Sequence, residues 1–247
     1  MSQSLGKNSK IVLLTGSSSL VGQAVIKDLS KDCFLICLDK NILKSINSKN
    51  IFYFKSDVTS EKKLNQIKKR IEKKFKRIDV VINCFVNQNY ETFEKQSLKK
   101  FSTAITDNIC GTFLITKIFF NLLKKSNNAQ IINFGSIYGI VSGDPLIYPT
   151  KKVTSDAYAA SKAAIIQLTK YYAVHLSKYK IRVNCISPGG IFNNQNKKLV
   201  KNYTKKVPLK RMADLNEIVN GVKILMKNES KYINGHNLII DGGYTIL

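Results

Sequence analysis

Short apolar runs alternate with longer amphipathic segments along the chain, and this alternation restricts the fold more than any other sequence feature. Runs rich in β-branched residues predict strands at 11–14, 33–38, 51–54, 80–83, 130–134, 182–186 and 237–240. Helical periodicity between them predicts helices at 20–30, 61–77, 97–125, 156–178 and 214–227. With no internal repeat and no Pro/Gly-rich linker, we predict one doubly wound α/β domain over residues 1–247, with a flexible amino terminus at 1–9.

The net charge of +24 raises the question of an anionic partner. In the segment 61–79, Leu64, Ile67, Ile71 and Phe75 recur at helical spacing, and lysines fill most of the remaining positions. This pattern is typical of the solvated face of a packed helix. We therefore predict a small-molecule partner, and neither nucleic acid nor membrane. An anionic sugar would be attracted by such a field.

Cysteine usage and hydropathy indicate the compartment. The 5 cysteines stand singly in apolar segments, and only 2 histidines are present, so we predict reduced thiols and no metal site. The first residues lack the apolar stretch of a secretory signal, and no apolar run approaches the length of a membrane span. We expect a cytoplasmic protein.

The first predicted strand runs directly into Thr15-Gly16-Ser17-Ser18-Ser19-Leu20-Val21-Gly22, a turn that could hold a pyrophosphate at the start of a helix. Gly16 could equally close an ordinary turn. The second strand ends in Asp39, whose carboxylate could accept both ribose hydroxyls of NAD and would repel the 2′-phosphate of NADP. Lys40 weakens this preference, because its ammonium could hold that phosphate, and a strand-end turn residue remains the alternative for Asp39.

Tyr158 and Lys162 lie four positions apart in the predicted helix 156–178, so their side chains share one face. A nearby ammonium favours the phenolate, and we expect it to lower the pKa of Tyr158. The pair is a candidate general acid/base, although the same spacing occurs by chance on ordinary helices.

Taken together in their order, these motifs resemble those of short-chain dehydrogenases/reductases from about residue 10 to the end of the chain. The matching segments are the Thr-Gly turn, Asp39, Asp57-Val58, Asn108 in DNICGTF, Ser136 in IINFGSIYG, Tyr158-x-x-x-Lys162, Pro188-Gly189 in RVNCISPGG and the carboxyl end NGHNLIIDGGY. The resemblance implies a Rossmann fold, a nicotinamide cofactor and a homodimer or homotetramer.

The resemblance also implies residue roles. Tyr158 would exchange the proton of the substrate oxygen, and Lys162 would lower the pKa of Tyr158 and bind the nicotinamide ribose. Ser136 would hydrogen-bond the reacting oxygen, and Asn108 would hold a relay water. The implied cofactor-binding residues are Gly16, Ser18, Ser19, Leu20, Val21, Asp39, Asp57, Val58, Asn83, Tyr158, Lys162 and Ile191. Of these, Asp57 and Val58 would contact adenine, and Ile191 would offer its backbone to the carboxamide.

Several departures from the family pattern concern the substrate. Leu20 replaces the middle glycine of the common loop, so TGSSSLVG resembles the form found in nucleotide-sugar enzymes, and Cys84-Phe85-Val86 replaces most of the usual Asn-Asn-Ala-Gly. Ser136 precedes Tyr158 by 22 positions, which leaves an inserted loop near 144–156 that we interpret as a substrate lid or as neutral surface elaboration. As a lid, it would bring Lys151 and Lys152 near an anionic group. The segment 192–206, the family's mobile substrate loop, is polar and basic.

These departures favour an NAD(P)-dependent oxidoreductase acting on a hydroxyl/carbonyl pair of a sugar or sugar derivative, with NAD the expected cofactor. The resemblance extends to members that make sugars for surface or flagellin glycans. The alternative within the enzyme class is a 3-oxoacyl-carrier-protein reductase, whose acidic partner would suit a basic surface. A non-catalytic nucleotide-sensing regulator is the hypothesis from another class.

Overall fold

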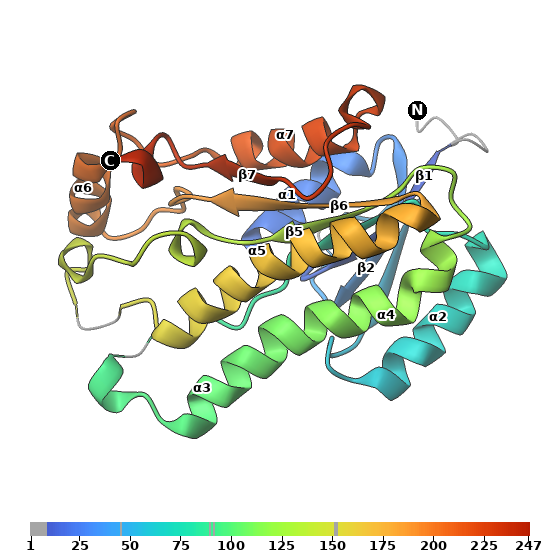
Figure 1. Ribbon diagram of the computed structural model, residues 1–247, viewed down its shortest axis with the longest axis horizontal. Helices are drawn as coiled ribbons and strands as arrows, with labels where there is room; N and C mark the ends of the chain where they lie inside the picture. Colours follow the sequence, from blue (N-terminus) through green and yellow to red (C-terminus); the bar gives the residue numbers. More distant parts are fainter. Residues whose placement is uncertain (1–8, 45, 89, 91, 151–152) are drawn as a thin grey trace.

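Parallel strands form a 7-stranded sheet in the order β3-β2-β1-β4-β5-β6-β7 (Figure 1). The computed structural model describes residues 9–44, 46–88, 90, 92–150 and 153–247. The strands are β1 (Lys10–Thr15), β2 (Cys33–Asp39), β3 (Ile51–Lys55), β4 (Val80–Asn83), β5 (Ala129–Phe134), β6 (Ile181–Pro188) and β7 (Asn237–Ile240). This topology confirms the predicted α/β fold. Residues 1–8 of the predicted flexible terminus lie outside the described residues.

Helices cover both faces of the sheet, and the side-chain alternation of the strands explains why. In β1, Ile11 and Leu13 join the apolar cluster under α2 (Glu61–Phe75), α4 (Gly111–Leu123) and α5 (Asp156–Leu176). The alternate residues Val12 and Leu14 join the cluster under α1 (Leu20–Leu29) and α7 (Leu215–Met226). Because successive strand side chains point to opposite faces, a continuous apolar run requires a helix layer on each side.

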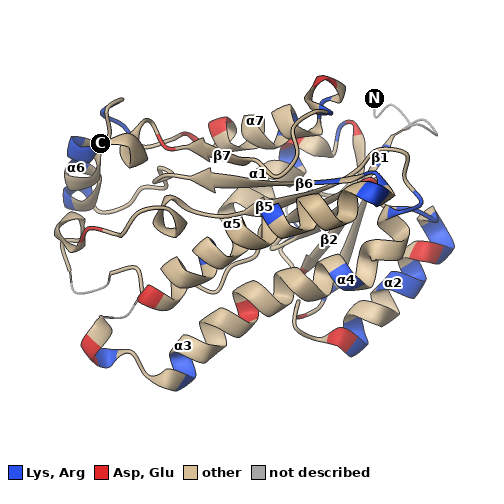
Figure 2. Cartoon of the chain, in the orientation of Figure 1, with Lys and Arg blue, Asp and Glu red and all other residues tan. Residues whose placement is uncertain are grey.

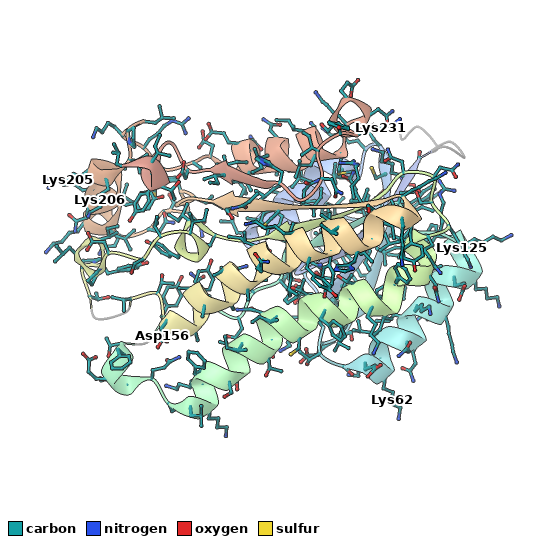
Figure 3. The ribbon with its side chains drawn as sticks, viewed as in Figure 1. Lys62, Lys125, Asp156, Lys205, Lys206 and Lys231 are labelled. Carbon is teal, nitrogen blue, oxygen red and sulfur yellow. The ribbon has the colours of Figure 1, made fainter. Side chains whose placement is uncertain are left out.

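The charged residues lie mainly outside these layers. In α2, Leu64, Ile67 and Ile71 are buried against the sheet, and basic side chains occupy much of the rest of the helix (Figure 2). Lys62 on α2 and Lys125 beyond α4 point away from the body of the protein (Figure 3). The structure therefore confirms the buried face of α2 that the helical spacing predicts. In the described part of the chain, no helix is both long and apolar enough to cross a bilayer.

The segment predicted as one helix at 97–125 is divided into three parts. It consists of α3 (Leu98–Ile105), a π-helical turn (Thr106–Cys110) and α4, which follow one another without a break. Such turns insert an extra residue into the helical spacing and occur often at functional sites. Apolar periodicity could not reveal this one, because the turn shifts the helix face by a single residue.

The polar segment 192–206, where the family has its mobile substrate loop, is not a loop throughout, because its last 10 residues form α6 (Lys197–Lys206). Asn196 caps the helix by accepting a hydrogen bond from the Lys198 amide, and Tyr203 is buried on its inner side. The lysines occupy the outer side, so α6 is a basic amphipathic helix.

Short 3₁₀ turns complete the described part of the chain. They are η1 (Phe93–Lys95), η3 (Ile137–Gly139), η4 (Pro145–Ile147), η5 (Ser177–Tyr179), η6 (Asn228–Ser230) and η7 (Tyr244–Ile246). The inserted loop with η4, the helix α6 and the carboxyl-terminal η7 lie at the same end of the molecule (Figure 1). Lys151 and Lys152 of this loop lie outside the described residues.

We expect α4 and α5 to mediate self-association, since both expose large apolar side chains. Phe113 is 44% exposed, Tyr171 55% and Val174 71%. Light scattering at micromolar concentration should give a mass of two or four times 27.8 kDa. Val174→Glu should shift the protein to smaller species, and Tyr232→Glu, at a fully exposed position beyond α7, should not. A monomeric wild type would contradict this expectation.

Candidate active site

The carboxyl ends of neighbouring strands are held together by a chain of buried hydrogen bonds. The Thr15 hydroxyl donates to Asn83 Oδ1 at 3.2 Å, and Asn83 Nδ2 donates to Asn133 Oδ1 at 2.9 Å. Asn133 Nδ2 in turn donates to the Thr169 hydroxyl of α5 at 2.9 Å. The network joins β1, β4, β5 and α5 at the edge where parallel sheets bind ligands. The Asn83 side chain, predicted to contact the cofactor, is thus occupied within the core.

The turn after β1 requires glycine at two positions. Gly16 has φ 70°, and a Cβ there would lie 2.3 Å from the backbone nitrogen of Phe85. A Cβ on Gly22 would lie 2.2 Å from the carbonyl oxygen of Gly16. The turn therefore packs against both the β4 loop and the first turn of α1 with no room for side chains.

Polar groups in this turn are free to receive an anion. The Ser17 hydroxyl is buried and has no hydrogen-bond partner among the described residues. Ser19 caps α1 by accepting from the Gly22 amide at 3.0 Å, and the Leu20 and Val21 amides donate to no described protein group. An orphaned buried hydroxyl beside free helix amides fits the pyrophosphate of a dinucleotide. The Leu20 side chain, which replaces the family glycine, is 42% exposed.

Asp39 at the end of β2 is fixed by two backbone amides. Its carboxylate accepts from Ser18 N–H at 2.9 Å and from Asn41 N–H at 3.1 Å. The amide of Ser18 is therefore committed to Asp39 instead of being free for a phosphate. Asp39 stands beside the glycine turn, where a ribose attached to the pyrophosphate would lie.

Lys40 is a candidate ligand for a 2′-phosphate, but its ammonium is already paired. It lies 3.0 Å from Asp57 Oδ2 and 3.4 Å from Asp107 Oδ2. Partial burial lowers the pKa of Lys40, but the hydrogen bonds and charges of the two carboxylates outweigh this and raise it overall. Asp57 also accepts from the Thr59 amide and hydroxyl, and Val58 is buried in the core.

Ser136, Tyr158 and Lys162 meet between β5 and the start of α5. Ser136 follows β5, and its hydroxyl accepts from the Tyr138 amide at 3.1 Å and hydrogen-bonds with the Tyr158 phenol. Ser155 caps α5 by accepting from the Tyr158 amide at 3.2 Å. Gly139 allows the close approach, because a Cβ there would lie 2.7 Å from the Lys162 backbone.

The expectation that Lys162 lowers the pKa of Tyr158 is wrong for this structure, in which the pKa of Tyr158 is raised. Burial raises the pKa of Tyr158 to about 12, while its hydrogen bond to Ser136 acts in the opposite direction. Lys162 does not offset this, because its ammonium donates to the Phe134 carbonyl at 2.6 Å and lies 5.7 Å from the Tyr158 ring centroid. Burial in turn lowers the pKa of Lys162 to about 8. In this state desolvation outweighs the attraction between the two groups.

Asn108 lies in the π-helical turn and is buried against the start of α5. Its Oδ1 accepts from the Asn87 amide at 2.7 Å, and its Nδ2 donates to the Ser161 hydroxyl at 2.9 Å. The extra residue of the turn thus lets α3 and α4 continue while Asn108 bridges the β4 loop and α5. Ile191, beyond β6, pairs with Ala213, yet its own amide donates to no described protein group. That amide is available for a ligand.

A set of hydroxyl-bearing side chains near Tyr158 was missed by the sequence reading. Tyr148 shares a 2.5 Å hydrogen bond with Thr154 and donates to the Tyr138 hydroxyl at 3.4 Å. Tyr90 pairs through its backbone with Thr154, and the charges that Tyr90 and Tyr148 would carry on ionisation raise the pKa of Tyr158. We call Tyr90, Tyr138, Tyr148 and Thr154 the hydroxyl wall. The recurrence of tyrosine at 138, 148 and 158 is the sequence signal that could have indicated it.

Comparison with known proteins identifies the family of this site. A family model described as enoyl-(acyl carrier protein) reductase matches residues 38–245. A short-chain dehydrogenase from Leptospira borgpetersenii, solved with bound NAD+, is 39% identical with a TM-score of 0.90, covering 96% of this chain and 93% of that one. The chain belongs to the short-chain dehydrogenase/reductase family. It is accordingly an NAD(P)-dependent oxidoreductase that acts on CH–OH groups.

Other relatives of this short-chain dehydrogenase are more distant and differ in their named roles. The NAD-dependent glycerol dehydrogenase of Listeria innocua is 27% identical over 96% of this chain and 94% of its own length. Post-translational flagellin modification protein A of Campylobacter coli is also 27% identical, over 95% of this chain and 98% of its own length.

The buried ammonium gives a prediction about stability and pH. Since the pKa of Lys162 falls from 10.5 to about 8 on folding, its protonated form destabilises the folded dehydrogenase below pH 8. The full effect is about 3 kcal/mol and disappears as pH rises to 10.5, where the unfolded state also loses the proton. Lys162→Met should therefore be more stable than wild type at pH 7, with a margin that shrinks by pH 9.5.

Urea unfolding at the two pH values measures this margin. Lys170→Met, at an exposed position on the same helix, is the matched control and should show no such convergence. If the free energies of unfolding of Lys162→Met and wild type differed by the same amount at both pH values, burial would not lower the pKa of Lys162.

Proposed function

We propose that this protein is an NAD-dependent dehydrogenase/reductase of a polyhydroxylated small molecule, a sugar or sugar derivative. The observation that carries this proposal is the hydroxyl wall beside Tyr158. Tyrosine and threonine hydroxyls both donate and accept, which suits substrate hydroxyls better than the methylene groups of an acyl chain. Similarity to a glycerol dehydrogenase supports the same substrate chemistry.

The preference for NAD rests on Asp39 and Lys40. Asp39 is held by two amides with its charge unopposed by an ion pair among the described residues, so it would repel a 2′-phosphate. Lys40 is occupied by Asp57 and Asp107 and would have to give up both to bind that phosphate. A ribose with two free hydroxyls meets neither cost.

In the proposed mechanism, the chain supplies a proton and holds the reacting oxygen. Bound NAD(H) would supply the hydride acceptor or donor. Neutral Tyr158 donates its proton to the oxygen of a carbonyl substrate during reduction, and the Ser136 hydroxyl holds that oxygen. During oxidation the phenol must first release its proton to solvent, and the Ser136 hydrogen bond lowers the cost of the resulting charge. The phenolate then takes up the proton of the substrate hydroxyl. Lys162 would turn from the Phe134 carbonyl toward a ribose hydroxyl.

A second candidate function, reduction of a 3-oxoacyl group on a carrier protein, is favoured by α6. Its exposed lysines form a basic surface at the substrate end (Figure 2), which would attract an acidic carrier. The description of the matching family model names carrier-protein chemistry as well. The hydroxyl wall gives no advantage to such a substrate, and we therefore rank this function second.

A substrate screen followed by NADH fluorescence distinguishes the two functions. Polyols and aldoses are offered with NAD+, and an acetoacetyl thioester is offered with NADH. We expect turnover with members of the first group. Turnover of the thioester alone would replace the proposed function by the second candidate.

Cofactor selection gives a direct binding prediction. Calorimetric titration should show NADH bound at least tenfold more tightly than NADPH, because the 2′-phosphate faces Asp39. Asp39→Ser should reduce this ratio several-fold by removing the charge. Asp28→Ser, which removes a carboxylate near the carboxyl end of α1 that pairs with Lys223 at 3.2 Å, should leave it unchanged. Equal affinity in the wild type would refute the assignment of Asp39.

The role of the phenol is tested by Tyr158→Phe. The substitution removes one oxygen, keeps the ring and should leave NADH affinity nearly unchanged. Turnover should fall by about 10²-fold or more, the usual scale for the loss of a positioned general acid/base. If turnover instead follows the folded fraction measured by melting temperature, Tyr158 is a structural residue only.

A further inference from the structure

The inserted loop between Ser136 and Tyr158 carries one side chain with an incompletely used hydroxyl. Tyr148 makes a short 2.5 Å hydrogen bond with Thr154, but its contact with the Tyr138 hydroxyl, at 3.4 Å, is at the long limit for O–H···O geometry. A phenol oxygen offers one donor and two acceptor positions. Tyr148 therefore keeps capacity for a stronger partner, and it lies close enough to Tyr158 for its charge to raise the pKa of that phenol.

The loop is held in place from α6 by polar contacts. Lys206 forms an ion pair with Asp144, whose carboxylate also accepts from the Leu146 amide at 2.8 Å. Asn202 Nδ2 donates to the carbonyls of Leu146 at 3.2 Å and Ile147 at 3.4 Å. These contacts fix η4 directly before Tyr148, so α6 determines where the phenol stands.

The same helix is anchored to the turn beyond β6. The Tyr203 hydroxyl accepts from the Gly190 amide at 2.5 Å, and its ring stacks on Tyr244 with centroids 5.3 Å apart. Buried Ile147 and Val207 join Tyr203 in one apolar cluster. The inserted loop, α6 and the turn that precedes Ile191 are thus packed as one unit around the substrate end.

We propose that Tyr148 is a specificity-determining residue that binds a substrate hydroxyl remote from the reacting carbon, and that Asp144, Asn202 and Lys206 are positioning residues for it. The inference rests on the proposed function and deepens it. A monohydroxy substrate would leave this phenol with its long contact to Tyr138. A polyhydroxy substrate would exchange that contact for a shorter one.

The decisive comparison uses two substrates. With NAD+, kcat and KM are measured for the best polyol from the screen and for cyclohexanol, which has a single hydroxyl. Tyr148→Phe should raise KM for the polyol about threefold to tenfold, the scale of one neutral hydrogen bond, with kcat nearly unchanged. For cyclohexanol it should change neither constant. Tyr232→Phe, at a fully exposed position, is the control.

Two outcomes overturn the proposal. Unchanged KM for both substrates would mean that Tyr148 only braces the loop. An equal loss of kcat for both would mean that it acts on the chemistry of Tyr158. Thioester turnover without polyol turnover in the screen would contradict the proposed function itself. In that case KM for the thioester is measured in Tyr148→Phe, and an unchanged value would mean that Tyr148 does not contact the substrate.

The positioning residues are tested on α6, where neighbouring lysines provide a matched pair (Figure 3). Lys206→Gln removes the ion pair with Asp144 and should raise KM for the polyol up to about fivefold, less at high salt. It should also speed tryptic cleavage within α6, a readout independent of any substrate. Lys205→Gln, which breaks no ion pair among the described residues, should do neither. Equal effects of both variants would show that general charge, and not the contact with the loop, is responsible.

Discussion

The active-site architecture depends on the buried hydrogen bonds that run from Thr15 through Asn83 and Asn133 to Thr169. Amide and hydroxyl groups in a core must find partners, because an unpaired one costs about 1–3 kcal/mol. Here they find them in the observed arrangement of β1, β4, β5 and α5. That arrangement places the glycine turn after β1 beside the segment after β5. An apolar core with the same shape would not fix this register as strictly.

Within this arrangement the chain buries two ionisable groups whose charged forms water would stabilise. Tyr158 and Lys162 are both desolvated, and their pKa values shift toward the neutral forms. Lys162 has no carboxylate partner among the described residues, and a buried lysine of this kind lowers stability. Such a cost is typical of functional sites. In the proposed function Lys162 would reach a ribose, and Tyr158, whose pKa is raised, is the protonated donor. The π-helical turn at Asn108 is a second irregularity at the same place.

The proposed substrate end is built differently from the proposed cofactor end. The glycine turn after β1 consists of backbone amides and glycine, which leave little freedom for variation. The proposed substrate end consists of side chains from an inserted loop and α6, joined by an ion pair, amide hydrogen bonds and a small apolar cluster. Loops of this kind tolerate insertion at low cost, so specificity can change there without disturbing the sheet.

The sequence by itself determined the strands, most helices, the glycine turn at Gly16 and the order of the candidate catalytic residues, because these depend on local periodicity and spacing. It also placed Asp39 at a strand end. Only the tertiary structure decided the direction of the Tyr158 pKa, the pairing of Lys40, the core position of the Asn83 side chain and the contact between Lys206 and Asp144. Each of these depends on distances between residues far apart in the chain and on how much water their packing excludes. No local pattern encodes either quantity.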